Sequence, residues 1–487
     1  MNRNGLLVNF DCQIKYNIGG ARMKKINQSP ETNINEELKT DSLISRIISS
    51  ISDFFDSIVR KFMPDPFIFA ILITVLTLLL GVFVERKSPL QMINYWGEGF
   101  WGLLTFAMQM VIVLITGYVL AQAPLIQRFL DRVASSVHTP RGAVILATLV
   151  GGLGSYINWG FGLIVGSIIA RKLAERIPTL HYPLVIAAAY SGFMFYGLGL
   201  SATIPLLIST KGHFLENSMG IIPTSETIFS PFSITMFVIL IVSLPIVNGM
   251  IRPKGKIIGV GHNDIQDQVN KTTKIEPQTP AEKMERSKII AFLAVTLGLV
   301  FIIQYFAIQK GSLDINIINF IMLFLGLVLH GSPRNYLNAV NVASKNVGGM
   351  IIQFPFYAGI MGMMDGSGLV STISKGFVVI SSPETLPFWG LLSSMVINFF
   401  TPSAGGHWAI QGPFMIEAAN AMGADLGKVA TSVQWGNAWQ DIIQPMWLLP
   451  ALAISGLRIR DIMGYNVIAF LWVGLVLGIG VLIWGFI

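Results

Sequence analysis

The stretch that decides the fold is Asn398-Phe399-Phe400-Thr401-Pro402-Ser403-Ala404-Gly405-Gly406-His407-Trp408. A second one is Gly154-Ser155-Tyr156-Ile157-Asn158-Trp159-Gly160-Phe161-Gly162. Each interrupts a long apolar region, at 388–420 and 142–170 respectively. Because glycine and proline break helices, we expect one helix to end and another to begin at each stretch. The two regions are therefore predicted to be helical hairpins.

The charges around the first hairpin indicate how it meets a membrane. Basic residues precede and follow it: Arg128, Arg132 and Arg141, then Arg171, Lys172 and Arg176. Lys and Arg are enriched in cytoplasmic connections, so both ends of the hairpin are expected on the cytoplasmic side. The hairpin would then be re-entrant. Backbone groups left unpaired inside a membrane are tolerated only beside protein or a water-filled cavity.

The composition agrees with an all-α integral membrane protein. Of 487 residues, 53% are hydrophobic and 12% are charged, and the mean hydropathy is +0.63. A soluble domain carries about twice that charged fraction, and apolar segments of roughly 20 residues can cross a bilayer. The net charge of +7 is spread over the connections, so we expect the lipid bilayer and no nucleic acid as a partner.

The chain repeats itself weakly at an offset near 244 residues. Leu80-Gly81, Ser88-Pro89 and Asn94 recur in the same order as Leu325-Gly326, Ser332-Pro333 and Asn338. We expect each half to hold two spans, an interrupted region, a long helix and a final span, and one extra span to join the halves. The expected segments are 66–84, 101–122, 142–170, 183–209 and 232–250, then 289–307, then 314–330, 347–364, 388–420, 429–456 and 465–487.

This arrangement predicts about nine full spans and two re-entrant hairpins, with the N-terminus inside and the C-terminus outside. Only six of the 33 basic residues then fall in outer connections: Arg86, Lys87, Lys211, Lys310, Lys375 and Lys428. The two halves run in opposite directions through the membrane. Inverted repeats with broken elements near the midplane are typical of secondary transporters.

The expected segments divide the chain into six regions. Residues 1–22 look like an upstream extension, because Met23-Lys24-Lys25 opens a stretch typical of a native start. Residues 42–63 have apolar residues at helical spacing, which is typical of an interfacial amphipathic helix or of a short soluble packing helix. The regions are a polar tail (1–41), the amphipathic helix (42–63), a first repeat (64–250), a cytoplasmic linker (251–288), a joining span (289–310) and a second repeat (311–487).

The hairpin tips are the expected substrate site. A helix that restarts after a break directs backbone N–H groups and a partial positive charge at the gap, which suits a carboxylate. No Lys or Arg lies within an expected span, so an anion would rely on helix ends, hydroxyls and amides. The alternative is a turn that serves packing alone. For His407 both roles are open: it ties down that turn or it contacts substrate. The predicted substrate-binding residues are Asn158, Trp159, Gly160, Thr401, Ser403, Gly405, Gly406 and His407.

Asp441 is the expected ion-coupling residue. It lies in the middle of the segment 429–456, and ionisable residues at that depth are functional by default. It can bind Na⁺ together with Asn437 and Gln444, or take up a proton, because removal from water penalises its charged form. The alternative is a structural hydrogen bond between helices. Apart from H⁺ or Na⁺, no cofactor and no metal are expected.

Four parts of the sequence resemble the bacterial short-chain fatty acid transporter family. They are Pro64-Asp65-Pro66-Phe67, Asn158-Trp159-Gly160, Gln434-Trp435-Gly436-Asn437 and the run from Phe400 through His407 to Pro413. The resemblance covers residue 42 to the C-terminus. It implies carriage of short monocarboxylates such as acetoacetate and butyrate across the bacterial cytoplasmic membrane, and membership of a superfamily of ion transporters with inverted repeats. A homodimer is left open.

The sequence is also compatible with other transport functions, whereas an enzyme or a primary pump is disfavoured. The nearest is a carrier of another organic anion, such as a dicarboxylate, or of an amino acid. Asp441 alone would also suit a cation/proton exchanger, and a channel is a further alternative. An enzyme is not expected, because Ser403 and His407 have no third orienting group and no G-x-S-x-G or H-E-x-x-H motif is present. A primary pump is disfavoured by the lack of a P-loop.

Overall fold

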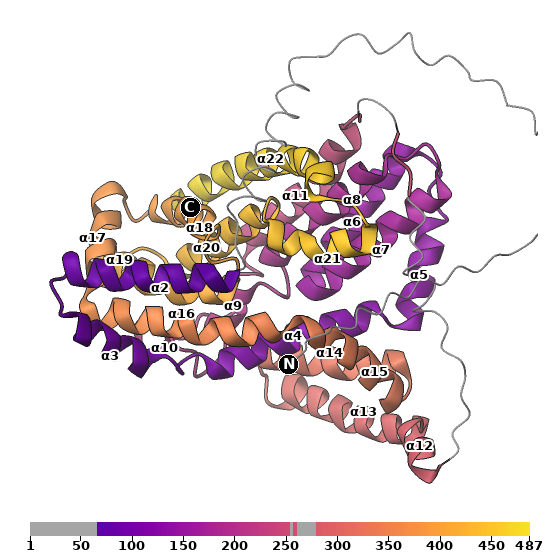
Figure 1. Cartoon of the computed structure of the whole chain (residues 1–487), viewed down its shortest axis with the longest axis horizontal. Helices are drawn as coiled ribbons and strands as arrows, with labels where there is room; N and C mark the ends of the chain where they lie inside the picture. The colour runs from indigo at the N-terminus through magenta and orange to yellow at the C-terminus, as the bar shows by residue number, and fades with distance from the viewer. Residues whose placement is uncertain (1–65, 254–256, 261–278) are drawn as a thin grey trace, which may run out of the picture. The chain divides into compact units, whose positions relative to one another are not determined.

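The computed structural model describes residues 66–253, 257–260 and 279–487, and their regular elements are all helices (Figure 1). The polar tail, the amphipathic helix at 42–63 and most of the linker lie outside the described residues. Those three predictions therefore stay predictions. Pro66–Ile487 holds both hairpins and every predicted site residue.

The first half begins at α2 and ends at α11. Serine or threonine caps followed by proline at the first helical position start several of its helices, as at Ser88-Pro89, Thr139-Pro140 and Ser230-Pro231. Its elements are α2 (Pro66–Phe83), α3 (Pro89–Gly99), α4 (Leu104–Ala121), α5 (Pro124–Ala134), α6 (Pro140–Ile157), α7 (Trp159–Arg176), α8 (Tyr182–Ser191), the 3₁₀ helix η1 (Gly192–Leu198), α9 (Thr203–Ile208), α10 (Glu216–Met219) and α11 (Pro231–Met250).

The second half has a similar order of elements. The helix α3 starts at Pro89 and α15 at Pro333, 244 residues later, and each follows a capping serine. The elements are α14 (Ile315–His330), α15 (Pro333–Ala343), η3 (Ser344–Asn346), α16 (Gly348–Ser367), α17 (Leu369–Ile380), α18 (Leu386–Ile397), α19 (Ala404–Met422), α20 (Leu426–Asp441), α21 (Pro445–Ser455) and α22 (Ile459–Phe486).

Between the halves lie α12 (Pro280–Glu285), α13 (Lys288–Ile303) and the π-helical turn η2 (Gln304–Ile308). This is the expected joining span, and most of its side chains are exposed. By contrast, the stretch Tyr182–Ile208 is almost wholly buried. The first is therefore peripheral and the second central in the helix assembly.

Six helical stretches of the described chain are long and apolar enough to cross a membrane. They are Leu104–Ala121, Pro140–Ile157, Tyr182–Ile208, Pro231–Met250, Lys288–Ile308 and Ile459–Phe486. A seventh is reached if α15 and α16, which are bent by 59°, count as one span. The expected count of nine is thus not confirmed. The helices at 67–83 and 315–330 are shorter, the segment 429–456 is divided between α20 and α21, and one of the six stretches, Pro140–Ile157, is an arm of the first hairpin.

The two expected long helices are in fact broken, which corrects the sequence prediction. The segment 183–209 changes from α8 to the 3₁₀ turn η1 and restarts at α9, and 429–456 is interrupted before Pro445. Glycine and proline are the physical reason in both cases. The buried N–H of Ile204 is satisfied across the molecule by Gln434 Oε1 at 2.9 Å.

The first hairpin, α6 and α7, is closed by glycines. A Cβ atom at Gly162 would lie 2.0 Å from Ser155 Oγ, and one at Gly166 would lie 3.3 Å from the Cα of Gly151. These pairs show that the two helices are antiparallel and in close backbone contact. Pro140 and Arg176 therefore lie at the same end of the hairpin, as the charge pattern predicts.

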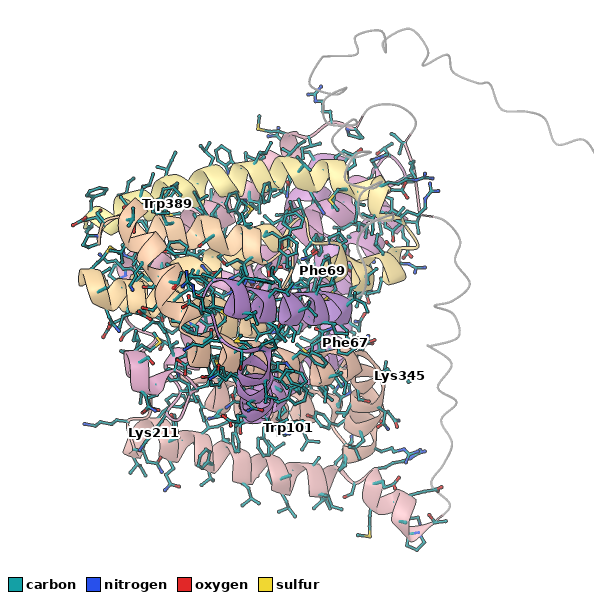
Figure 2. The ribbon with its side chains drawn as sticks, turned by 60° about the vertical axis from the view of Figure 1, so that its left-hand side comes forward. Phe67, Phe69, Trp101, Lys211, Lys345 and Trp389 are labelled. Carbon is teal, nitrogen blue, oxygen red and sulfur yellow. The ribbon has the colours of Figure 1, made fainter. Side chains whose placement is uncertain are left out.

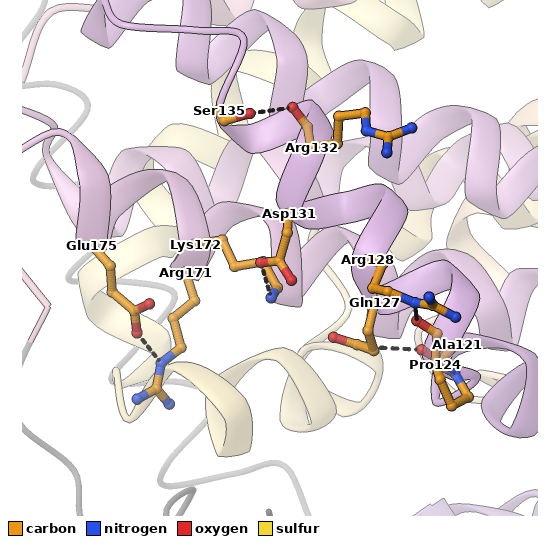
Figure 3. Close-up of polar contacts among 10 residues, drawn as sticks. All are labelled: Ala121, Pro124, Gln127, Arg128, Asp131, Arg132, Ser135, Arg171, Lys172 and Glu175. Atoms are coloured by element: carbon orange, nitrogen blue, oxygen red, sulfur yellow. Dashed lines mark hydrogen bonds and ion pairs between the residues drawn. The ribbon is translucent and has the colours of Figure 1, made fainter.

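The base of this hairpin is tied to α5 by charged groups (Figure 3). Lys172 Nζ on α7 lies 2.5 Å from Asp131 Oδ1 on α5, and Arg171 pairs with Glu175 one turn along α7. Exposed ion pairs contribute about 0–1 kcal/mol each. They orient the cytoplasmic end predicted for the hairpin more than they stabilise it.

The second hairpin, α18 and α19, is held by side chains instead. His407 Nε2 on α19 contacts Ser394 Oγ on α18 at 3.0 Å, and Gln411 Nε2 reaches Ser393 Oγ at 2.9 Å. The helix α18 also lies along α20 (Figure 1). Polar side chains therefore join the two arms of this hairpin, and α18 packs along α20 of the same half.

Aromatic side chains of α2 reach both α16 and the second break. Phe67 packs edge-on against Phe356 of α16, with ring centroids 5.1 Å apart, and Phe69 packs edge-on against Phe400 at 6.0 Å. Both α2 residues are labelled in Figure 2. The first helix of the described chain thus flanks the tip of the second hairpin.

Candidate functional site

The tips of the two hairpins meet at a small cavity. Its walls come from Trp159 at the start of α7 and from Ser403, Ala404 and Gly405 at the start of α19. The remaining lining is largely apolar, with Tyr196 and Thr203 as further polar groups and with Met110, Phe193, Met350 and Trp447. Its volume is about 20 Å³, enough for about one water molecule. The structure therefore describes a closed arrangement of the tips.

The first tip is capped by its own side chain. Asn158 is a one-residue break between α6 and α7, and its Oδ1 accepts a hydrogen bond from the N–H of Phe161 at 3.0 Å. Its Nδ2 donates to the carbonyl oxygen of Val113 on α4 at 3.1 Å. The side chain is 1% exposed. Asn158 thus occupies the anion-attracting end of α7 and fixes that end to α4.

The second tip has no such cap. The break runs over residues 398–403, and the Ser403 side chain makes no capping hydrogen bond to α19. Since the first turn of a helix has N–H groups without an intrahelical partner, α19 presents free donors beside the cavity. The Oγ1 of Thr401 is buried and has no hydrogen-bond partner. Unsatisfied polar groups gather at this tip.

The predicted glycines have different surroundings. A Cβ at Gly405 would lie 2.2 Å from the ring of Phe106, and one at Gly406 would lie 2.3 Å from the ring of Tyr357. A Cβ at Gly160 would lie 3.2 Å from the Leu114 carbonyl oxygen. Gly405 also lines the cavity. Gly160 and Gly406 serve close packing against α4 and α16 and lie outside the cavity wall.

His407 lies between helices and away from the cavity. Its Nε2 contacts Ser394 Oγ and Gln411 Oε1, and Ser394 Oγ donates to the carbonyl oxygen of Val433 on α20 at 2.7 Å. The Ser394 hydroxyl proton is used for Val433, and the Gln411 oxygen carries no proton. His407 Nε2 must therefore carry the proton and be the donor in both contacts. The side chain is fully buried. His407 thus links the two arms of the hairpin, α19 and α18, and Ser394 links the hairpin to α20.

Asp441 lies at the end of α20 in a buried network that joins the halves. Its Oδ2 accepts from the hydroxyl of Tyr196 at 2.8 Å, and its Oδ1 accepts from Nδ2 of Asn398 at 2.7 Å. Asn437 Nδ2 donates to Asn398 Oδ1 at 2.5 Å, and Gln444 Nε2 donates to the Asn398 carbonyl oxygen at 3.1 Å. The three predicted ion-coupling residues are thus brought together around the second break.

This network has more acceptor contacts than protons to fill them. The amide of Asn398 has two protons but three acceptors within 3.0 Å: Asp441 Oδ1, Gln440 Oε1 and the Asn437 carbonyl oxygen. The single hydroxyl proton of Tyr196 faces Asn437 Oδ1 at 2.6 Å and Asp441 Oδ2 at 2.8 Å. Gln444 Oε1 is buried without a partner. The Nε2 of Gln440 is likewise buried without a partner, so unused donors and acceptors are both present. At Asp441 itself, an added proton would end the competition for the single Tyr196 hydroxyl proton.

Four members of the network are not among the site residues predicted from the sequence: Tyr190, Tyr196, Asn398 and Gln440. Asn398 opens the stretch that predicts the second break, and Gln440 directly precedes Asp441, so their positions in the sequence are a usable signal. Tyr190 donates to the carbonyl oxygen of Asp441 at 2.6 Å from α8. Tyr196 also lines the cavity, so one side chain touches both parts of the site.

The family model and the relatives that match this chain are all of transporters. A family model for the short chain fatty acid transporter matches residues 47–484. A relative from Escherichia coli, named "Putative short-chain fatty acid transporter", is 41% identical over 436 residues, which is 89% of this chain and 99% of the relative. A relative of the same name from Haemophilus influenzae is 41% identical over 443 residues, with the same shares of the two chains covered.

Two solved structures share the fold. The YdaH transporter of Alcanivorax borkumensis has a TM-score of 0.58 at 14% identity, with 86% of this chain and 98% of that chain covered. MtrF of Neisseria gonorrhoeae, described as one of a class of antimetabolite efflux pumps, has a TM-score of 0.53 at 14% identity, with 90% and 98% covered. The relatives are transporters, which agrees with the exclusion of an enzyme. This multi-pass membrane protein belongs to the short-chain fatty acid transporter family.

Proposed function

We propose that the protein is a secondary transporter that carries short monocarboxylates such as acetoacetate and butyrate across the bacterial cytoplasmic membrane. The observation that carries this proposal is the uncapped N-terminus of α19, with Ser403 in the wall of the cavity between the hairpin tips. Free N–H groups and the helix dipole bind a carboxylate. Met110, Phe193 and Trp447 on the same cavity suit a short alkyl chain.

The same lining argues against a dicarboxylate. None of the residues around the cavity is Lys or Arg, and the first tip already has its N-terminal donor bound by Asn158. One carboxylate can therefore be satisfied, at α19, while a second would be left without a partner. A buried charge without a partner costs several kcal/mol.

Alternating access follows from the arrangement of the halves in this proposal. The order and spacing of α2 to α11 and α14 to α22 support a duplication, and the cytoplasmic charge bias supports opposite orientations of the two copies. The hairpins would part to admit substrate, because a cavity of about 20 Å³ is far smaller than a butyrate ion. The nine spans, the orientation of the termini and the homodimer stay predictions.

Coupling is proposed to run through Tyr196 to Asp441. The ring of Tyr196 borders the cavity and its hydroxyl touches the Asp441 carboxylate at 2.8 Å. A proton on Asp441 would donate to the Tyr196 oxygen, and Tyr196 would then donate to Asn437 Oδ1. This fits the network as it stands, whereas Na⁺ would have to displace the Asn398 amide from Asp441. We therefore favour H⁺ over Na⁺ as the coupling ion.

The proposal is tested by uptake of labelled acetoacetate and butyrate into proteoliposomes. A pH gradient and a Na⁺ gradient are imposed in turn, and succinate serves as the dicarboxylate competitor. We expect accumulation under an inward proton gradient, competition by short monocarboxylates and none by succinate. If neither acid enters faster than into empty liposomes under any gradient, the substrate assignment is wrong.

A further inference from the structure

A second, larger cavity lies at the other end of α6 from the hairpin tip. Its volume is about 620 Å³, within the usual range for small-molecule sites. It is formed by the start of α6, the connection before α8 and the end of α11, with Arg141, Leu184, Met250, Arg252 and Ile257 among its walls. The 18 residues of α6 separate it from the tip by about 25 Å.

This cavity is positively charged. Arg141 and Arg252 both line it, and no Asp or Glu is among its described lining residues. Neither arginine forms an ion pair within the described chain. The start of α6 adds the partial positive charge of a helix N-terminus. The cavity is therefore suited to an anion.

The remaining titratable group of the cavity, His181, adds no charge near neutral pH. Burial lowers the pKa of His181 below its usual value. Its Nδ1 accepts a hydrogen bond from the N–H of Ile258 at 3.2 Å, and the carbonyl oxygen of Ile258 accepts from the N–H of Tyr182 at 2.8 Å. These contacts hold the segment 257–260 against the start of α8.

An apolar stripe leads along α11 into the cavity. Every fourth residue of α11 is an exposed aliphatic or methionine side chain: Ile234, Val238, Val242, Ile246 and Met250. Residues four apart lie on the same face of a helix. Met250, 65% exposed, is at once the end of this stripe and part of the cavity wall. In a membrane protein such a face is in contact with acyl chains.

We propose that this cavity binds the phosphate headgroup of an anionic phospholipid whose acyl chains lie along the apolar stripe of α11. Arg141 and Arg252 bind the phosphate. Basic pockets on the cytoplasmic side of membrane proteins bind lipid headgroups in this way, and Arg suits phosphate through its planar donors. A soluble phosphate would use the same arginines, but it would leave the stripe unused. The proposal does not depend on which acid the protein carries.

The test measures binding of phosphatidylglycerol to the full-length protein in phosphatidylcholine nanodiscs, by displacement of a fluorescent phosphatidylglycerol analogue. We compare the wild type with the double variant Arg141→Gln/Arg252→Gln and with the charge-matched control Arg128→Gln/Arg132→Gln on α5. Loss of two arginines near an anionic lipid should weaken binding roughly thirtyfold, and the control should bind as the wild type does. The double variant Arg141→Lys/Arg252→Lys keeps the charge but loses the planar donors, so its affinity should lie between those of the wild type and of the glutamine variant.

Two further arms identify the source of the phosphate and the role of the stripe. Glycerol phosphate and inorganic phosphate should fail to displace the lipid analogue at millimolar concentration, and Met250→Asn should weaken lipid binding while both arginines remain. Equal affinity of wild type and the Arg141→Gln/Arg252→Gln variant for phosphatidylglycerol would overturn the proposal. Displacement by inorganic phosphate alone would overturn the lipid assignment in favour of a soluble anion.

Discussion

The two hairpin tips differ in how they satisfy the helix that follows the break. At the first tip, a single residue, Asn158, caps α7 and binds α4. At the second, residues 398–403 are non-helical, Ser403 leaves α19 uncapped and the Thr401 hydroxyl has no partner. The first is therefore a fixed wall and the second a tip with unused donors. Two elements of similar construction can thus divide the work of support and binding.

The segments that follow the two hairpins, 182–208 and α20, contribute different chemical groups to the buried network. Asp441 of α20 corresponds to Gly197 in the first half at the 244-residue offset, and Gly197 is packed against Ala438 of α20. The second half supplies the carboxylate and amides, while the first supplies the tyrosines that contact them. The halves are thus complementary at their contact, and each of the following variants tests one side of that asymmetry.

The largest effect is expected for Asp441→Asn. This change removes the only carboxylate of the network at nearly constant size, so proton-driven accumulation should fall roughly a hundredfold, the upper end of usual coupling energies. Substrate counterflow without a gradient should persist. The measurement is uptake and counterflow in proteoliposomes. Asp425→Asn, at the exposed cap of the same helix, is the control, and gradient-driven accumulation that survives in Asp441→Asn would remove the residue from coupling.

Ser403→Ala should act on substrate affinity. Ser403 lines the cavity and makes no cap bond, so its loss removes a hydrogen bond to the carboxylate and leaves α19 intact. Such a bond to a charged group is worth about 1.5 kcal/mol or more. We expect KM for butyrate to rise about tenfold with an unchanged Tm. An unchanged KM would mean that the second tip does not contact the substrate.

Asn158→Ala should show the converse pattern. It removes the cap of α7 and one of two side-chain hydrogen bonds to the buried Val113 carbonyl oxygen, which keeps the bond from the Thr116 hydroxyl at 3.2 Å. The two losses together should cost about 2 kcal/mol of the free energy of unfolding. Thermal unfolding of the purified protein measures this loss. KM for the variant, measured below its Tm, should stay near that of the wild type. A large rise in KM with an unchanged Tm would reverse the roles assigned to the two tips.

The smallest effect concerns the caps of α8 and α20. At the 244-residue offset His181 corresponds to Asp425, and burial lowers the pKa of His181 below 6.5. The unfolded chain then binds a proton more readily than the folded one, so the contribution of His181 to stability is full above pH 6.5 and is lost as pH falls. His213, whose pKa burial also lowers, acts in the same direction.

His181→Asn separates this contribution from that of His213. The variant should lower Tm at pH 7.5 but show a smaller fall in Tm between pH 7.5 and pH 5.5 than the wild type does. Asparagine suits a helix cap and does not titrate. An identical pH dependence in both proteins would place the acid sensitivity elsewhere in the chain.

The sequence predicts the hairpins because their signals are local. Pro402 and the glycines of 404–406 mark one break, Asn158 marks the other, and Arg141 and Arg176 mark a common end of the first hairpin. Asp441 was identifiable because a carboxylate in an apolar segment is conspicuous. Its burial, at 1% exposure, agrees with that reading. These features need no knowledge of which helices pack together.

The partners of Asp441 could not be found in the same way. Tyr196 is 245 residues from it in the chain, and a tyrosine in an apolar helix is unremarkable until packing places its hydroxyl. The break between α8 and α9 has no distinctive sequence signal, because glycine-rich apolar stretches also occur in intact membrane helices. The sequence left the role of His407 open between the turn and the substrate, because it shows the motif but not the contact with Ser394.

The small volume between the tips has a consequence for the energy balance of the cell. A space for about one water molecule cannot hold a continuous file of waters between the tips. If protons move with cargo as proposed, the closed tips would keep them from crossing there at rest. A membrane that holds many copies of the protein would then lose its electrochemical gradient through this cavity only when cargo parts the hairpins.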